Sequence, residues 1–293
     1  MRCLKYSYQV LFVLLLAVNS VQAAQPALWK LEYQDKVSWV FGTIHASTQA
    51  MRSDNSLGLV KNKIANARLL ITEVDLAQYS AEQQQQLALK VALLNNGKNL
   101  QQQVDEKTWQ SLLSYQQNKG IPENAFSAFT PWFVALQLSI IEGQIAGLDF
   151  TQSIDDILMQ HARANQVQVS GLESLEQQLG FFANSDMSEQ LLVDTLAQIQ
   201  TNEYTVKHLA DMWQSGEIGQ LEKLLTLGLD EYPSTDFVLD TLLKERNQNW
   251  MSTLIKEVKT GNVVIAVGLM HMVGENSIIQ HLEQQGVNIK RVQ

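Results

Sequence analysis

Two histidines stand in the same short pattern at opposite ends of the chain. The segment Gly42–His45 (GTIH) lies near the start and Gly268–His271 (GLMH) near the end, and each follows residues typical of a buried strand. Imidazole is a common metal ligand and a general base near neutral pH. Glycine permits a tight turn and the close approach of a ligand. One Gly-x-x-His motif is weak, but two copies after strands favour a shared site.

Carboxylates follow two further predicted strands. Glu73 and Asp75 come after the apolar run 68–72, and Glu173 comes after the run 167–170. Because α/β folds place ligands beyond the carboxyl ends of sheet strands, we expect these side chains to meet the histidines. Two histidines with a carboxylate predict a hydrolytic metal centre, in which the ion lowers the pKa of bound water to about 7. The alternative is that the glutamates are ordinary charges at helix N-termini.

Several other classes of protein are disfavoured. The sequence has no Gly-x-Ser-x-Gly elbow, no glycine-rich phosphate loop and no His-Glu-x-x-His motif. The single cysteine, Cys3, precedes an apolar run at the N-terminus, so a thiol nucleophile and a disulfide framework are both excluded from the mature chain. A formal net charge of -9 argues against nucleic-acid binding, which needs a clustered basic surface.

Strand signals at both ends of the chain flank a long helical region. We expect a hairpin of residues 27–33 and 37–41 at the start, and strands at 262–267 and 287–292 at the end. Helical spacing dominates the region between them. The sequence therefore predicts one α/β (or α+β) domain with a central mixed sheet formed by the N- and C-terminal strands and a large helical insert. This domain spans 24–293, with 76–166 and 174–259 mainly helical.

Residues 1–23 have the pattern of a secretory signal peptide. Arg2 and Lys5 precede the apolar run 10–18, which is too short to span a bilayer, and small residues follow at 21–23. An uncleaved membrane anchor is the alternative. We expect a periplasmic or secreted protein with no stable membrane span after signal cleavage.

The chain resembles the TraB/PrgY/GumN family, and specifically its secreted bacterial GumN-like branch, which is related to the Tiki metalloproteases. The resemblance covers nearly the whole mature chain and rests on short blocks that occur in the family's order. These are WVFGTIH at 39–45, EVD at 73–75, IDDIL at 154–158, GLESLEQQL at 171–179, Arg246-Asn247 with Trp250, and VGLMHMVG at 267–274.

The resemblance implies a metal-dependent peptidase centre formed by His45, His271 and Glu73. Glu173 and Arg246 fall in other characteristic blocks and are expected to complete the pocket, where a guanidinium could hold a carboxylate or an oxyanion. Two departures stand out. The family's Gly-Val-Asp block reads Ser-Ile-Asp at 153–155, which loses a glycine but keeps the aspartate. Methionine replaces leucine at 272, a small apolar change.

The histidines and carboxylates predict a metal-dependent hydrolase, and the resemblance implies that it acts on peptides or proteins. The two motif histidines and Glu73 would bind a divalent ion, for which zinc, manganese or cobalt are suitable. Glu173 or Asp75 would be the general base, and Arg246 would stabilise the developing oxyanion. No nucleic-acid partner is expected, and the oligomeric state is open.

Two other functions stay open at this point. The same pocket could belong to a non-catalytic binding protein for a peptide, a polysaccharide or a metallo-ligand such as haem, and turnover of a ligand would distinguish the two. A helical interaction module in 76–166 is the third interpretation, although its amphipathic faces are explained more simply by core packing.

Overall fold

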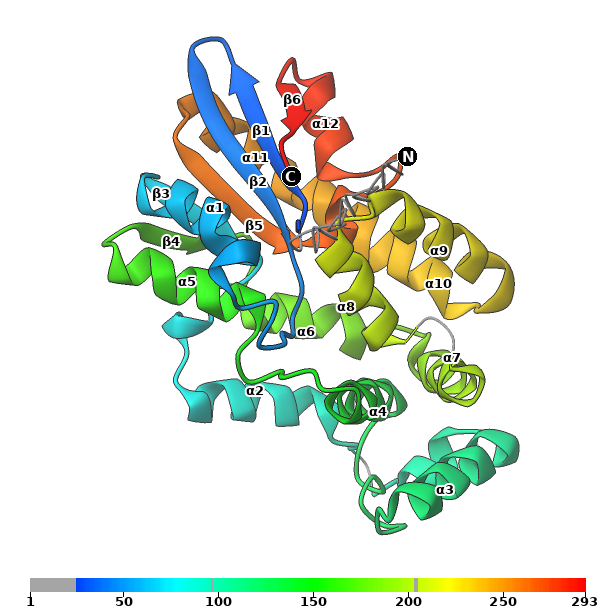
Figure 1. Ribbon diagram of the computed structural model, residues 1–293. Coiled ribbons are helices and arrows are strands. Elements are labelled where there is room, and N and C mark those ends of the chain that lie inside the picture. The colour runs from blue at the N-terminus through cyan, green and yellow to red at the C-terminus, as the bar shows by residue number, and fades with distance from the viewer. Residues whose placement is uncertain (1–24, 96, 203–204) are drawn as a thin grey trace, which may run out of the picture.

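A six-stranded mixed sheet lies in the upper part of the molecule in Figure 1, with helices packed against it and a further group of helices beyond its lower end. The computed structural model describes residues 25–95, 97–202 and 205–293, so the predicted signal peptide at 1–23 lies outside the described residues. The strands are β1 (Leu28–Tyr33), β2 (Lys36–Thr43), β3 (Leu69–Thr72), β4 (Gln168–Gly171), β5 (Val263–Gly268) and β6 (Asn288–Arg291).

The strand order is β4-β3-β5-β2-β1-β6. The first four strands in this order run parallel to one another, whereas β1 is antiparallel to both β2 and β6. Strands from both ends of the chain therefore join one mixed sheet, as the sequence predicts. The terminal strand β6 pairs with β1, and β5 lies between β2 and β3.

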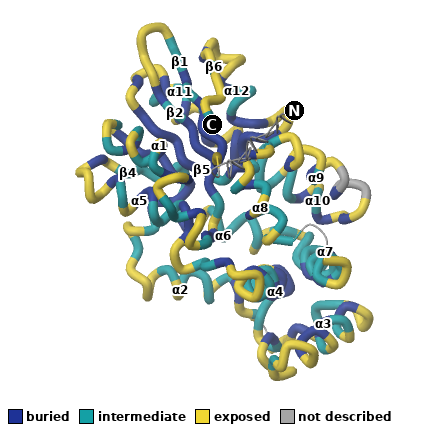
Figure 2. Tube along the Cα trace, viewed as in Figure 1, coloured by how far each residue is buried: buried dark blue, intermediate teal, exposed yellow. Residues whose placement is uncertain are grey.

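The buried strands have the composition that a sheet covered on both faces requires. All five residues from Val263 to Val267 are fully buried, and β3 is buried throughout. Parallel strands covered on both faces are continuous apolar runs, because neither face meets water. Figure 2 shows this buried centre beneath helices whose outer surfaces are exposed.

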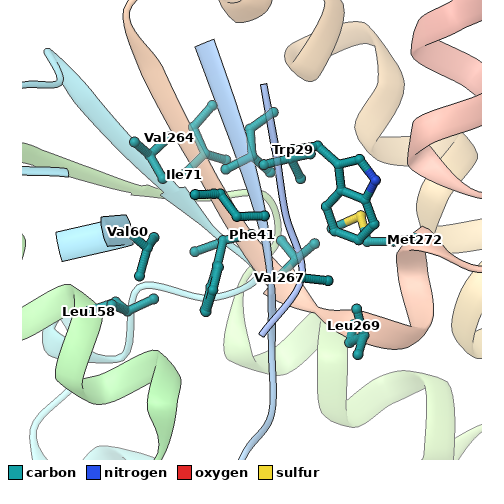
Figure 3. Close-up of a cluster of buried hydrophobic side chains, with 14 of the residues drawn as sticks. Trp29, Phe41, Val60, Ile71, Leu158, Val264, Val267, Leu269 and Met272 are labelled. Atoms are coloured by element: carbon teal, nitrogen blue, oxygen red, sulfur yellow. The ribbon is translucent and has the colours of Figure 1, made fainter. Parts of the chain in front are cut away.

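Two pairs of helices contact the sheet. Helices α1 (Asp54–Ala65) and α5 (Ile154–Ala164) pack on each other and on β5, while α11 (Arg246–Thr260) and α12 (Ile278–Gln284) contact each other and the strands β1, β2 and β6. Figure 3 shows Val60 of α1 and Leu158 of α5 beside Phe41 of β2 within the main core.

A second apolar core forms away from the sheet, among α3 (Glu106–Lys119), α4 (Pro131–Ile145) and α7 (Ser188–Thr201). Its fully buried members include Leu112, Leu138 and Leu192. Helix α2 (Ala81–Ala92) links this region to α6 (Leu175–Ala183). The apolar faces of these helices are largely occupied by one another, which favours core packing over a docking module.

The helical run before α11 departs from the α-helical pattern. Helices α8 (Val206–Ser215), α9 (Ile218–Glu231) and α10 (Ser234–Phe237) are followed by the π-helix η3 (Val238–Glu245), which continues directly into α11. The π-helix is not foreseen by a 3.6-residue period, because apolar spacing does not reveal an added residue in a turn. Among the described residues, none of the helices has the length and apolar character needed to cross a bilayer.

Candidate functional site

The carboxyl ends of four parallel strands bring the predicted site residues together. Thr43 of β2 pairs with Gly268 of β5, so the two Gly-x-x-His segments continue from adjacent strands. Thr72 of β3 pairs with Ala266 of β5 on one side and Gly171 of β4 on the other. This end of the sheet lies opposite the β1–β2 turn, towards α6 and α8 (Figure 1).

Arg246, the first residue of α11, lies at the centre of the site. Its Nη2 is 2.5 Å from Oε2 of Glu73 and 2.5 Å from Oε1 of Glu173, and its Nε is 3.3 Å from Oε2 of Glu173. All three side chains are at least nine-tenths buried. One buried guanidinium therefore holds two buried carboxylates, which are charges that need hydrogen-bonded partners away from water.

The hydrogen bonds of His271 define its tautomer. Nδ1 lies 2.7 Å from Oδ1 of Asn247, and Nε2 lies 3.3 Å from Nη1 of Arg246 and 3.6 Å from Oε1 of Glu73. Because a guanidinium only donates, Nε2 accepts and the proton resides on Nδ1, which donates to Asn247. Burial lowers the pKa of His271 to about 3, despite the opposing charge of Glu73, so the ring is neutral at pH 7.

Glu73 is ionised in this environment. Burial by itself would raise its pKa. Protonated His271, at the low pH where Glu73 titrates, and the charges of His45 and Arg246 lower it below the usual value, as does the Gly268 amide. The Gly268 amide donates to Oε1 at 2.8 Å. Nε2 of Gln178, on α6, donates to Oε2 at 3.0 Å. Each oxygen of the carboxylate therefore has a donor that favours the charged form.

The pKa of Glu173 is shifted in the opposite direction to that of Glu73. Burial raises the pKa of Glu173, and the hydrogen bond and charge of Arg246 only partly offset this effect. The indole Nε1 of Trp250 also donates to Oε2 of Glu173, at 3.2 Å. The two carboxylates that share Arg246 are thus shifted in opposite directions, which is an arrangement found in acid–base sites.

His45 lies at the exposed edge of the site. Its side chain is 65% exposed, and its Nδ1 is 3.0 Å from Oδ2 of Asp155. Oγ1 of Thr43 donates to the other oxygen of Asp155 at 2.6 Å. Asp155 raises the pKa of His45, although water around so exposed a ring weakens the effect. Asp155 therefore orients the ring through Nδ1.

The structure places Asp75 apart from the Arg246 cluster. Its carboxylate forms an ion pair with Arg163 of α5 and accepts hydrogen bonds from the Ala77 amide and the Gln78 side chain, each at 3.3 Å. It caps the short 3-10 helix η1 (Leu76–Gln78). Of the four carboxylate and guanidinium residues predicted for catalysis, Glu73, Glu173 and Arg246 are in mutual contact and Asp75 is not.

Three side chains that orient the predicted residues were not assigned roles by the sequence: Asp155, Asn247 and Trp250. Asp155 was visible as the aspartate retained in the IDDIL block. Asn247 and Trp250 share a helix and a family block with Arg246, and the Arg246–Trp250 spacing of i, i+4 places both on one face. Trp250 packs on His271 with ring centroids 4.5 Å apart.

Gly42 is needed because α8 and the second motif both approach its backbone. A Cβ atom there would overlap the side chain of Leu269 and come within 3.0 Å of its Cα, while the indole of Trp213 donates to the Gly42 carbonyl at 2.8 Å. We predict that Gly42→Ala lowers the free energy of unfolding by about 1–3 kcal/mol, as overpacking does. Urea unfolding of Gly58→Ala in α1 is the control.

A Cβ atom on Gly58 would meet only the Cβ of Asp54, at a van der Waals distance of 3.9 Å, and Gly58 lies inside a helix, so alanine there should be neutral or stabilising. Equal stability of Gly42→Ala and the wild type would contradict the role given to this close approach.

The described part of the chain contains no group of three or more His, Cys, Asp or Glu side chains arranged closely enough to hold a metal ion. At the centre of the site, the guanidinium of Arg246 contacts both Glu73 and His271.

Parallel strands that end in a buried cluster of ionisable side chains define an α/β protein with a polar site at the carboxyl edge of its sheet. The chain belongs to the TraB/PrgY/gumN family, whose model matches residues 27–291.

Two curated relatives are similar to the chain over most of their length. Both are described as uncharacterized protein YbaP. The one from Shigella flexneri is 28% identical over 248 residues, covering 84% of this chain and 87% of the relative. The one from Escherichia coli (strain K12) is 28% identical over 246 residues, covering 83% and 86% respectively. The comparison with solved structures gave no match.

Proposed function

We propose that this protein is a periplasmic or secreted metal-dependent hydrolase that cleaves peptides. One observation carries the proposal. Two histidines from distant Gly-x-x-His motifs follow adjacent parallel strands, and each ring is held through Nδ1 by a side-chain oxygen next to the buried Glu73 cluster. The resemblance to GumN-like proteins and Tiki metalloproteases supports the same reaction class.

The donor types at this edge suit a divalent ion. His45, His271 and Glu73 offer two imidazoles and a carboxylate, which zinc, manganese and cobalt all accept. Hydrogen-bonding of Nδ1 to Asp155 or Asn247 is also the usual way in which a protein orients a histidine to coordinate through Nε2. The fit requires Arg246 to release both Glu73 and the Nε2 of His271 while it keeps Glu173.

Each remaining group has a role that follows from its environment. A bound ion would supply a water molecule of lowered pKa. Glu173, whose pKa is raised by burial, is the candidate general base, since a base works best with a pKa closer to neutrality. Arg246 would stabilise the oxyanion that develops on the scissile carbonyl. Asp75 is assigned to its ion pair with Arg163 instead.

Metal content tests the proposal. After reconstitution with zinc, manganese or cobalt and dialysis, we expect about one ion per chain in the wild type and a loss of both metal and peptide cleavage in His45→Ala/His271→Ala. The double variant His161→Ala/His281→Ala, which changes two helical histidines outside the site, should keep both properties. Absence of retained metal after every reconstitution would contradict the metal-dependent mechanism.

A binding protein without turnover is the second candidate function. It is favoured by the contacts of Arg246, because the hydrogen-bond donors of its guanidinium are already occupied by Glu73, Glu173 and His271. Such a protein would be stabilised thermally by its ligand but would leave the ligand unchanged. Mass spectrometry of a peptide mixture after incubation separates the two functions, because only a hydrolase yields fragments.

A further inference from the structure

A large cleft opens next to the Arg246 cluster. It has a volume of about 1010 Å³ and lies between α6, α10, the π-helix η3 and the start of α11. Glu173 and Trp250 line it, and both are also part of the site described above. Small-ligand pockets usually span about 300–1,000 Å³, so this cleft has room for an extended peptide segment.

The charge of the cleft has one sign. Six carboxylates line it, from Glu173, Glu176, Asp186, Asp236, Asp240 and Glu245, and its lining contains no Lys, Arg or His. Arg246 neutralises Glu173, and Lys244 pairs with Asp240 at 3.0 Å. Asp186, Asp236 and Glu245 form no ion pair with any other residue in the described ranges. The cleft therefore keeps a negative potential, which attracts cations.

Aromatic side chains give the cleft an apolar floor. Phe237 and Trp250 are buried and Phe181 is partly buried, and all three line the cleft. The Arg246 guanidinium already lies over the rings of Phe181 and Trp250, 5.8 and 4.7 Å from their centroids. Such a floor suits the hydrocarbon stems of Lys and Arg, whose charged ends would reach the carboxylates at the rim.

The π-helix connects the cleft to the site. Asp240, Thr241 and Glu245 of η3 line the cleft, and the next residue in the chain is Arg246. π-helical turns are rare and often occur at functional sites. A ligand held along η3 would therefore lie directly beside the guanidinium and the Glu173 carboxylate.

We propose that this cleft binds a segment of a peptide substrate that carries Lys or Arg side chains, and so directs a neighbouring peptide bond to the Arg246 cluster. The proposal rests on the proposed peptidase function and names its substrate class. Charge complementarity, the apolar floor and the shared residues Glu173 and Trp250 support a basic peptide over an acidic or neutral one.

Binding of two labelled peptides tests the proposal. Both are fluorescein-labelled dodecapeptides of identical sequence except that four Lys residues in one are four Glu residues in the other. We expect fluorescence anisotropy to give a dissociation constant at least about tenfold lower for the Lys peptide, with a difference that shrinks as salt is added. Equal affinities for the two peptides would overturn the proposal.

Two triple variants locate the effect. Asp186→Asn/Asp236→Asn/Glu245→Gln removes three charges from the cleft and should abolish the preference for the Lys peptide. Glu82→Gln/Glu123→Gln/Glu275→Gln removes three exposed charges elsewhere and should keep it. An equal loss in both variants would assign the effect to the overall charge of the chain and overturn the proposal. Thermal unfolding of each variant verifies that it is folded.

Cleavage is measured in the same samples by mass spectrometry. Tight, cleft-dependent binding of the Lys peptide without cleavage would support the cleft and contradict the peptidase function. Cleavage of both peptides at equal rates, unchanged in the cleft variant, would support the peptidase function and overturn the cleft proposal.

Discussion

Arg246→Ala is expected to lower the free energy of unfolding by about 3–5 kcal/mol, the usual cost of removing one partner from a buried ion pair. The variant leaves the carboxylates of Glu73 and Glu173 buried without their shared cation. Burial disfavours an unpaired charge, so the carboxylates would have to take up protons, admit water or unfold their surroundings. Urea unfolding at pH 7 measures the loss.

A double-mutant cycle separates this electrostatic cost from the loss of packing around Trp250. Arg246→Met keeps much of the side-chain volume, Glu173→Gln removes one of the two carboxylate charges, and Arg246→Met/Glu173→Gln combines both changes. We expect the double variant to be more stable than Arg246→Met alone, because Glu173→Gln removes a carboxylate that burial already makes costly. Additive effects of the two substitutions would contradict the coupling that the geometry indicates.

The stability of the protein should fall between pH 6.5 and pH 4.5 because of His271. Its pKa is lowered to about 3 in the folded chain, whereas an unfolded histidine titrates near 6.5. Between these values the unfolded state binds a proton that the folded state does not, so stability decreases as the pH falls. One such proton corresponds to about 1.4 kcal/mol per pH unit.

Other groups in the site act in different directions or at different pH. The lowered pKa of Glu73 stabilises the fold above pH 4.5, and that contribution is lost only at lower pH. The raised pKa of Glu173 has the opposite effect to His271. Above pH 4.5 the folded state binds this proton more readily than the unfolded state, so stability increases as the pH falls. The effect of His271 is therefore measured by comparing the pH dependence of the free energy of unfolding in the wild type and in His271→Gln. This variant keeps a neutral side chain at that position.

Urea unfolding at a series of pH values from 4.5 to 7.5 gives the slope of the free energy of unfolding against pH for the wild type and for His271→Gln. We expect His271→Gln to be less stable than the wild type at pH 7, because its hydrogen bond to Asn247 is lost, and to have the weaker dependence on pH. Identical slopes would contradict a neutral, buried His271.

The sheet was predictable in outline because its signals are local. Residues 262–267 form a β-branched run that could only be a buried strand, and 27–33 with 37–41 show a hairpin pattern, so both ends of the chain could be assigned to one sheet. The position of β5 between β2 and β3 could not be read in the same way. Strand order depends on packing between distant segments, which residue periodicity does not encode.

In the site, too, features set by nearby residues were predictable, whereas contacts between distant segments were not. Placing Glu73 after β3 and the histidines after β2 and β5 required only the strand boundaries. The separation of Asp75 from Glu73 depends on Arg163, which reaches Asp75 from α5. The contact of His45 with Asp155 likewise joins two segments 110 residues apart. A π-helix ends immediately before Arg246, and its altered turn leaves no clear mark in the sequence.

The position of β5 between β2 and β3 has a consequence for how the chain folds. Until the last part of the chain is available, β2 lacks its parallel neighbour and β3 has an open edge. Contacts of such long sequence separation form slowly, because loop closure must precede the gain from pairing. During synthesis, the strands that precede β5 would therefore have exposed edges that are prone to aggregate. A chaperone that holds these segments until β5 arrives would raise the yield of folded protein.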